Sequence, residues 1–159
     1  MGPRVSVKAL VLQGERILLN RCEDHTNGVY YTLPGGGQEQ YESLEQALIR
    51  EVREETGYTV KPIQFVGLHE EIFTDSFLRQ HYPAYMHRLY PIFLCACTDE
   101  PRITPTKTDI SQKDCEWIAL TALSSIHILP RTVAEQLPSL LTIHGAQFLG
   151  TDYTANNHG

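Results

Sequence analysis

The 159-residue sequence lacks long hydrophobic stretches and has few positive charges. No apolar run approaches the roughly 20 residues that a membrane-spanning helix needs, and residues 1–5 show no hydrophobic region of a signal peptide. With 13 Lys and Arg against 19 Asp and Glu, the formal net charge is −6. This balance argues against broad binding to nucleic acid or anionic lipid. We therefore expect a cytoplasmic protein with neither a membrane nor a nucleic-acid polymer as partner.

Cysteine is also scarce, and no two cysteines form a CxxC pair. The four are Cys22, Cys95, Cys97 and Cys115. Cys95 and Cys97 alternate within a strand-like run, which predicts that both lie on one face of that strand. We interpret all four as reduced and buried thiols in a reducing compartment.

The overall composition is that of an ordinary globular domain, with 42% hydrophobic and 20% charged residues. A chain of this length buries about 68–70% of the surface that its unfolded form exposes, so it needs no disulfide to fold. We expect one domain over residues 1–150. The polar residues 151–159 are expected to form a flexible tail.

Strand patterns alternate with two helix signals. The first helix is expected to start near Ser43, because Ser43 and Gln46 fit the S-x-x-Q capping box, and to end before Gly57. The second is expected to begin near Pro130 and to be interrupted or ended at Pro138. This mixture indicates an α/β (α+β) layered domain. The expected strands cover residues 5–12, 16–21, 29–33, 60–66, 89–97 and 116–120.

The first expected helix carries its acidic residues on an unexpected side. On a helical wheel, Glu51, Glu54 and Glu55 lie on or beside the apolar face. They also lie near the helix C-terminus, where each negative charge costs about 0.3–1 kcal/mol. Arg50 is the only basic residue nearby on that side, and one arginine cannot balance three carboxylates. A divalent metal ion would balance them, and oxygen ligands favour Mg²⁺ or Mn²⁺ over zinc.

The same residues complete a known motif. Gly36, Glu42 and residues 50–58 resemble the Nudix box, G-x5-E-x7-R-E-U-x-E-E-x-G-U, over 23 residues. Every fixed position is filled, and Tyr58 stands where an aliphatic residue is usual. Residues 31–37 also resemble the aromatic-x-L-P-G-G sequence that precedes the box in that family. The surrounding strand order fits the Nudix-type α/β/α sandwich, with a mixed β-sheet between helices, along most of the chain.

The resemblance implies a metal-dependent pyrophosphohydrolase. Its substrate would contain a diphosphate linkage in a nucleoside diphosphate derivative, such as an NTP, a dNTP or another nucleotide conjugate. In Nudix proteins the glutamates at Glu51, Glu54 and Glu55 bind the catalytic metal ions, and the backbone carbonyl at Gly36 often joins them. The arginine at Arg50 orients these glutamates. Divalent ions suit this chemistry, because they neutralise a polyanion and acidify a bound water.

Substrate contacts are expected on both sides of the box. The resemblance implies substrate-binding roles for Tyr31 and for Gly35, Gly36 and Gly37. Arg21 ends a strand where Nudix proteins often carry a phosphate-binding arginine. A solvated strand end is the competing interpretation of Arg21.

The general base has several candidates. Some Nudix proteins use a box glutamate, and others use an acid from a later segment. Glu116 is the favoured candidate outside the box, because Glu-x-Trp-like segments recur there in the family. Glu70 and Glu71 are weaker alternatives, and a plain surface position competes as an interpretation of Glu116.

The substrate subclass stays open. Residues 73–87 form an irregular, ring-rich segment that would either stack a nucleobase or make a dimer or core contact. The downstream tags of ADP-ribose, dinucleoside polyphosphate and NADH hydrolases are absent, so a nucleoside triphosphate or another nucleotide derivative is favoured. The alternative is a non-catalytic, nucleotide-sensing Nudix domain. A homodimer is compatible with the family.

Overall fold

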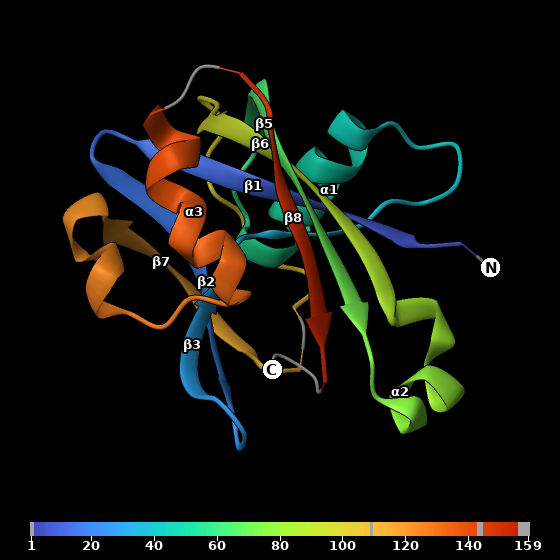
Figure 1. Cartoon of the computed structure of the whole chain (residues 1–159). Helices are drawn as coiled ribbons and strands as arrows, with labels where there is room; N and C mark the ends of the chain where they lie inside the picture. The colour runs from blue at the N-terminus through green and yellow to red at the C-terminus, as the bar shows by residue number, and fades with distance from the viewer. Residues whose placement is uncertain (1, 109, 143–144, 156–159) are drawn as a thin grey trace.

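A mixed β-sheet in the order β3-β2-β1-β6-β5-β8 runs through the computed structural model, which describes residues 2–108, 110–142 and 145–155 (Figure 1). Two further strands lie outside this order and pair with inner strands, β4 with β1 and β7 with β2. The β1–β6 and β5–β8 pairs are parallel, and the other pairs are antiparallel. The strands are β1 (Arg4–Gln13), β2 (Arg16–Asp24), β3 (Gly28–Thr32), β4 (Gly35–Gly37), β5 (Val60–Phe73), β6 (His87–Cys97), β7 (Gln112–Ala119) and β8 (Gln147–Thr154).

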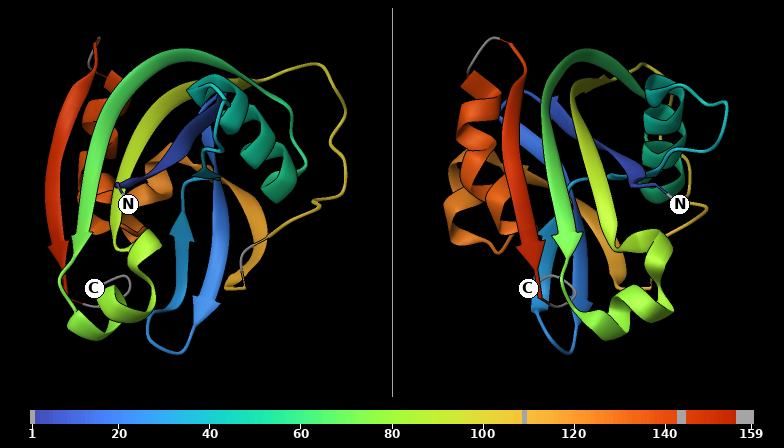
Figure 2. Two further views of the ribbon diagram at one scale, coloured as in Figure 1. Left: turned by 90° about the vertical axis from the view of Figure 1, so that its right-hand side faces the viewer. Right: turned by 45° about the vertical axis from the view of Figure 1, so that its right-hand side comes forward.

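Alternating side chains of β1 contribute to two hydrophobic cores. Val7 and Val11 pack with residues of α1 (Leu44–Thr56), whereas Leu10 packs with residues of α3 (Arg131–Thr142). Neighbouring residues of a strand point to opposite faces, so α1 and α3 cover opposite sides of the sheet (Figure 2). The expected layered arrangement, with a mixed sheet between helices, is confirmed. Cys95 and Cys97 both belong to the α1 side, as their spacing predicts.

The ends of α1 lie where the sequence predicts them. The Ser43 side chain accepts a hydrogen bond from the Gln46 backbone N–H, and the Gln46 side chain accepts one from the Ser43 backbone N–H. Gly57 ends the helix with φ of 79°. A Cβ at that position would lie 1.9 Å from the carbonyl oxygen of Ile103, so glycine is required there.

Two segments differ from their sequence-based predictions. Residues 73–87, expected to be irregular, contain α2 (Ser76–His81) and a short 3-10 helix (Pro83–Tyr85). The helix α3 also continues through Pro138 to Thr142. Leu137 and Leu140 on either side of this proline are buried in the core, and their packing offsets the backbone hydrogen bond that proline cannot make.

The expected tail is also partly structured, because β8 extends past residue 150. Thr151 pairs with Glu70 and Thr154 pairs with Phe73, in parallel register with β5. This pairing joins segments about 80 residues apart, so no local pattern signals it. Residues 156–159 of the expected tail lie outside the described residues. None of the helices that the structure describes is long and apolar enough to span a membrane.

Candidate functional site

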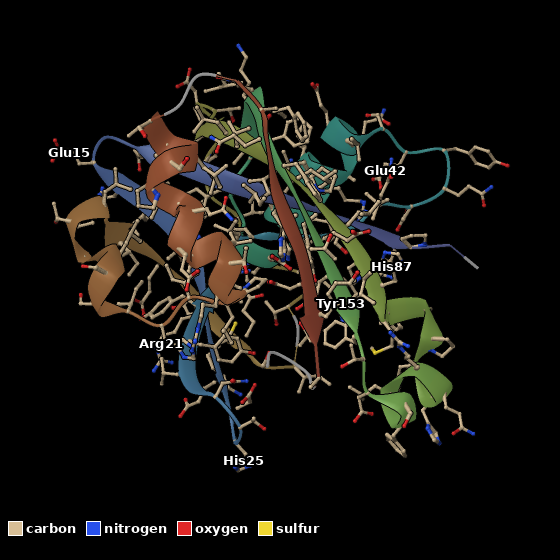
Figure 3. All side chains as sticks on the ribbon, viewed as in Figure 1. Glu15, Arg21, His25, Glu42, His87 and Tyr153 are labelled. Carbon is tan, nitrogen blue, oxygen red and sulfur yellow. The ribbon has the colours of Figure 1, made fainter. Side chains whose placement is uncertain are left out.

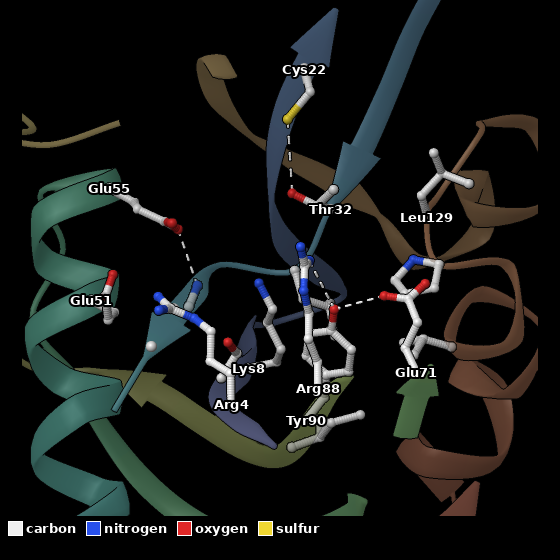
Figure 4. A pocket seen from close by; sticks show the side chains of 18 of the residues that line it. Arg4, Lys8, Cys22, Thr32, Glu51, Glu55, Glu71, Arg88, Tyr90 and Leu129 are labelled. Atoms are coloured by element: carbon white, nitrogen blue, oxygen red, sulfur yellow. Dashed lines mark hydrogen bonds between the residues drawn. The ribbon is translucent and has the colours of Figure 1, made fainter. Parts of the chain in front are cut away.

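A cavity of about 310 Å³ lies where β1 and β2 separate. These strands pair only beside their connecting turn; farther along, β1 pairs with β4, while β2 pairs with β3 and β7. Figure 4 shows Glu51 and Glu55 reaching toward this cavity from α1, with Glu71 on the other side. Its volume is at the lower end of the range for small-molecule sites. The fold thus brings the acidic helix to a ligand-sized cavity.

The glycines of β4 allow α1 to approach this cavity closely. Gly35 has φ of 146°, and a Cβ there would lie 1.9 Å from the Val7 carbonyl oxygen. At Gly36 a Cβ would lie 2.3 Å from Oε2 of Glu51. Glycine is therefore needed at position 35 for the backbone path, and at position 36 so that a carboxylate can lie against the main chain.

Arg50 binds several acidic groups of the box at once. Its guanidinium donates to both carboxylate oxygens of Glu42, at 2.7 and 2.9 Å, and to Oε1 of Glu51 at 2.8 Å. It also lies 3.4 Å from Glu54 and donates to the Gly37 carbonyl oxygen at 3.0 Å. The hydrogen bonds from Arg50 lower the pKa of the Glu42 carboxyl to about 2. Arg50 thus links the start of the box to the glutamates of α1.

Glu55 is positioned by neutral donors instead. Its Oε2 accepts hydrogen bonds from the Asn20 side chain at 2.8 Å and from the Gly35 backbone N–H at 3.0 Å. The Gln112 amide donates to the Asn20 side-chain oxygen at 3.3 Å and to the Glu55 carbonyl oxygen at 3.1 Å. Asn20 and Gln112 were not predicted from the sequence, because neither belongs to a motif.

The three glutamates expected to bind metal differ in their exposure. Glu51 and Glu55 are buried and line the cavity, whereas the Glu54 side chain is 27% exposed and does not line it. Within residues 2–108, 110–142 and 145–155, no three His, Cys, Asp or Glu side chains converge closely enough to hold a metal ion. The donor chemistry still fits a divalent metal, because carboxylate oxygens lie against the backbone of Gly36.

The fold adds positive charge that is not evident from the helix alone. Arg50 is the only cation near the acidic face of the isolated helix, but four cations from other segments line the same cavity. They are Arg4, Lys8, Arg88 and Lys107. The helical wheel covers only residues of the helix itself, so these four cations could not be predicted from it.

Arg21, Tyr31 and Glu116 lie together, but away from the box. The Tyr31 hydroxyl donates to Glu116 at 3.3 Å, and Nε of Arg21 lies 3.7 Å from the same carboxylate. None of the three lines the cavity, although Cys22, the neighbour of Arg21, does. Cys22 lines the cavity and adjacent strand residues point to opposite faces, so Arg21, which is labelled in Figure 3, points away from the cavity.

The two weaker candidates for the general base differ in their position relative to the cavity. Glu70 pairs with Nε2 of His87 at 2.9 Å and does not line the cavity. Glu71 is buried and lines it, and its carboxylate accepts hydrogen bonds from the hydroxyls of Tyr90 at 2.9 Å and Thr154 at 3.2 Å. Burial raises the pKa of the Tyr90 hydroxyl, so this group stays a donor to Glu71 near neutral pH.

Comparison with known proteins gives a consistent result. Residues 2–140 match the family model described as the NUDIX domain. The NAD-capped RNA hydrolase NudC of Pseudomonas aeruginosa is 31% identical over 140 residues, which cover 87% of this chain and 44% of that protein. The chain thus spans less than half the length of this relative.

Solved structures agree on the fold. A MutT NUDIX hydrolase from Burkholderia pseudomallei is 25% identical with a TM-score of 0.61, covering 86% of this chain and 99% of that one. A MutT protein from Bacillus halodurans is 18% identical with a TM-score of 0.69, covering 96% of this chain and 90% of that one.

Proposed function

Because the chain belongs to the NUDIX family, we propose that it is a metal-dependent pyrophosphohydrolase that cleaves a diphosphate linkage in a nucleotide derivative. One observation carries this proposal. Glu51 and Glu55 of α1 line the same cavity as the backbone of Gly35 and Gly36, and glycine at position 36 leaves room for the Glu51 carboxylate. Carboxylates beside a main chain in a small cavity suit a cation-bridged phosphate.

The residues of the box have distinct roles in this proposal. Glu51, Glu54, Glu55 and the carbonyl of Gly36 would hold Mg²⁺ or Mn²⁺, which when bound neutralises phosphate charge and makes a water molecule more acidic. Arg50 positions Glu51 and Glu54 through its guanidinium.

The substrate class follows from chemistry and from the relatives. The cavity volume and the acidic helix suit a nucleoside triphosphate or another nucleotide conjugate. The name of the NudC relatives includes NAD-capped RNA, so the expectation that no nucleic-acid polymer is a partner needs a direct test.

A substrate screen tests the activity. With Mg²⁺ or Mn²⁺, we expect hydrolysis of at least one member of a panel of nucleoside triphosphates, nucleotide sugars, ADP-ribose, NAD, dinucleoside polyphosphates and NAD-capped RNA. A chelator should abolish this hydrolysis, measured as released phosphate, pyrophosphate or mononucleotide. If no compound is cleaved but nucleotides bind in a metal-dependent way, the nucleotide-sensing alternative replaces the proposal.

Two acids outside the box can be compared directly as the general base. Glu71 lines the cavity and Glu116 does not, so we expect Glu71→Gln to lower kcat at least about tenfold and Glu116→Gln to stay within about twofold of the wild type. Glutamine keeps an acceptor oxygen for the Tyr90 hydroxyl, so the fold should persist; melting temperatures check this. The opposite ranking would restore Glu116 as the base candidate.

A further inference from the structure

Three cations face the cavity from neighbouring strands. Arg4 and Lys8 lie on β1, and Arg88 lies on β6 directly opposite Arg4 in the parallel register. We call these three residues the cationic strip. None of them forms an ion pair with an Asp or Glu in the part of the chain that the structure describes.

Aromatic rings and neutral oxygens hold the cationic strip in place. The Arg4 guanidinium lies 4.8 Å from the ring centroid of Tyr85, and Nζ of Lys8 lies 5.8 Å from that of Tyr90. Arg88 donates to the Tyr85 carbonyl oxygen at 2.7 Å and to the Tyr90 hydroxyl at 3.2 Å. These contacts orient the charges without neutralising them.

Such an arrangement is unfavourable unless an anion is present. Like charges directly opposite one another on neighbouring strands destabilise a sheet. The chain has 19 acidic residues, so acidic partners were available in its composition. Figure 4 shows the side chains of Arg4, Lys8 and Arg88 between the carboxylates of α1 and Glu71, within the same cavity. Glu71 lies opposite Arg88 in the β5–β6 register, but the two form no ion pair, so an anionic ligand that also reaches α1 would supply the missing partner.

We propose that the cationic strip binds a phosphate group of the nucleotide beyond the two that flank the cleaved bond. This inference rests on the proposed function, in which the glutamates of α1 and their metal ions take the cleaved diphosphate. The cationic strip adds three positive charges to those that Arg50 and the metal ions would supply there. The extra phosphate would be either the third phosphate of a nucleoside triphosphate or a phosphate on a ribose.

The test measures binding without metal and without turnover. In EDTA at low salt, isothermal titration calorimetry compares ATP with ADP and NADP⁺ with NAD⁺, so that each pair differs by one phosphate. We expect the wild type to bind one phosphate-richer member more tightly, and Lys8→Gln to weaken that binding about tenfold. The pair that responds identifies the position of the extra phosphate. Lys61→Gln, on the exposed part of β5 outside the cavity, is the matched control and should change affinity less than twofold.

The outcomes separate this inference from the proposed function. If Lys8→Gln binds both pairs as the wild type does, the inference is wrong, whether or not the protein hydrolyses nucleotides. If the variant loses phosphate affinity in a protein that cleaves no substrate, the inference stands and the proposed function fails. Arg4→Gln, at the exposed start of β1, provides a second variant should Lys8→Gln lower the melting temperature.

Discussion

Replacing Glu54 with glutamine is expected to lower kcat on the order of a hundredfold while leaving the fold intact. Glu54 has a partly exposed side chain, and its contact with Arg50 is long, at 3.4 Å. Surface ion pairs of this kind contribute about 0–1 kcal/mol to stability. A large loss of turnover therefore could not be explained by unfolding, and it would indicate a role for this carboxylate in holding the metal ion.

A control on the same helix makes the Glu54 experiment specific. Glu45 is exposed in the first turn of α1, so Glu45→Gln removes the same charge far from the cavity and should keep kcat within about twofold. Millimolar Mg²⁺ should raise the melting temperature of the wild type and of this control, and raise that of Glu54→Gln less. Wild-type turnover in Glu54→Gln would remove the basis for the proposed metal site.

Local signals in the sequence predict the acidic helix and the glycine-rich segment that precedes it. Ser43, Gln46 and Gly57 determine the ends of α1 through contacts within a few residues, and the structure confirms them. The residues outside the motif that position Glu55 could not be predicted in this way. Asn20 and Gln112 meet because β2 pairs with β7, and they are 92 residues apart in the chain. A single sequence contains no local pattern that records such a pairing.

The face of the strand on which a side chain lies explains the remaining differences between the predicted and the observed site residues. A shift of one residue along a strand moves a side chain to the other face. Arg21 was selected as a strand end and Glu116 for its Glu-x-Trp-like segment; neither signal specifies the face, and neither residue lines the cavity. The spacing of Arg4 and Lys8 is visible in the sequence, but the position of Arg88 beside them depends on the parallel β1–β6 pairing. The cationic strip could therefore be recognised only in the fold.

Gly35 and Gly36, the first two of the three glycines of β4, are expected to respond differently to substitution by alanine. At Gly35 the new Cβ would meet the backbone carbonyl of Val7 at 1.9 Å, and φ is 146°, so the main chain itself would have to move. We expect Gly35→Ala to lose about 3 kcal/mol or more of unfolding free energy, which corresponds to a melting temperature roughly 6–12 °C lower. Gly14→Ala is the control, because φ there is 59° but nothing lies within 4 Å, so only the conformational strain of about 1 kcal/mol remains.

At Gly36 the obstacle is the carboxylate of Glu51, with Oε2 at 2.3 Å, and a side chain can move where a backbone cannot. Gly36→Ala should therefore retain most of its stability, yet displace Glu51 from the main chain and lower kcat at least about tenfold. Thermal unfolding and initial rates on the best substrate measure both effects in the same preparations. If Gly36→Ala turned over substrate at the wild-type rate, the contact between Glu51 and the β4 backbone would have no part in catalysis. The close contact of the Glu51 carboxylate with Gly36 would then need an explanation other than catalysis.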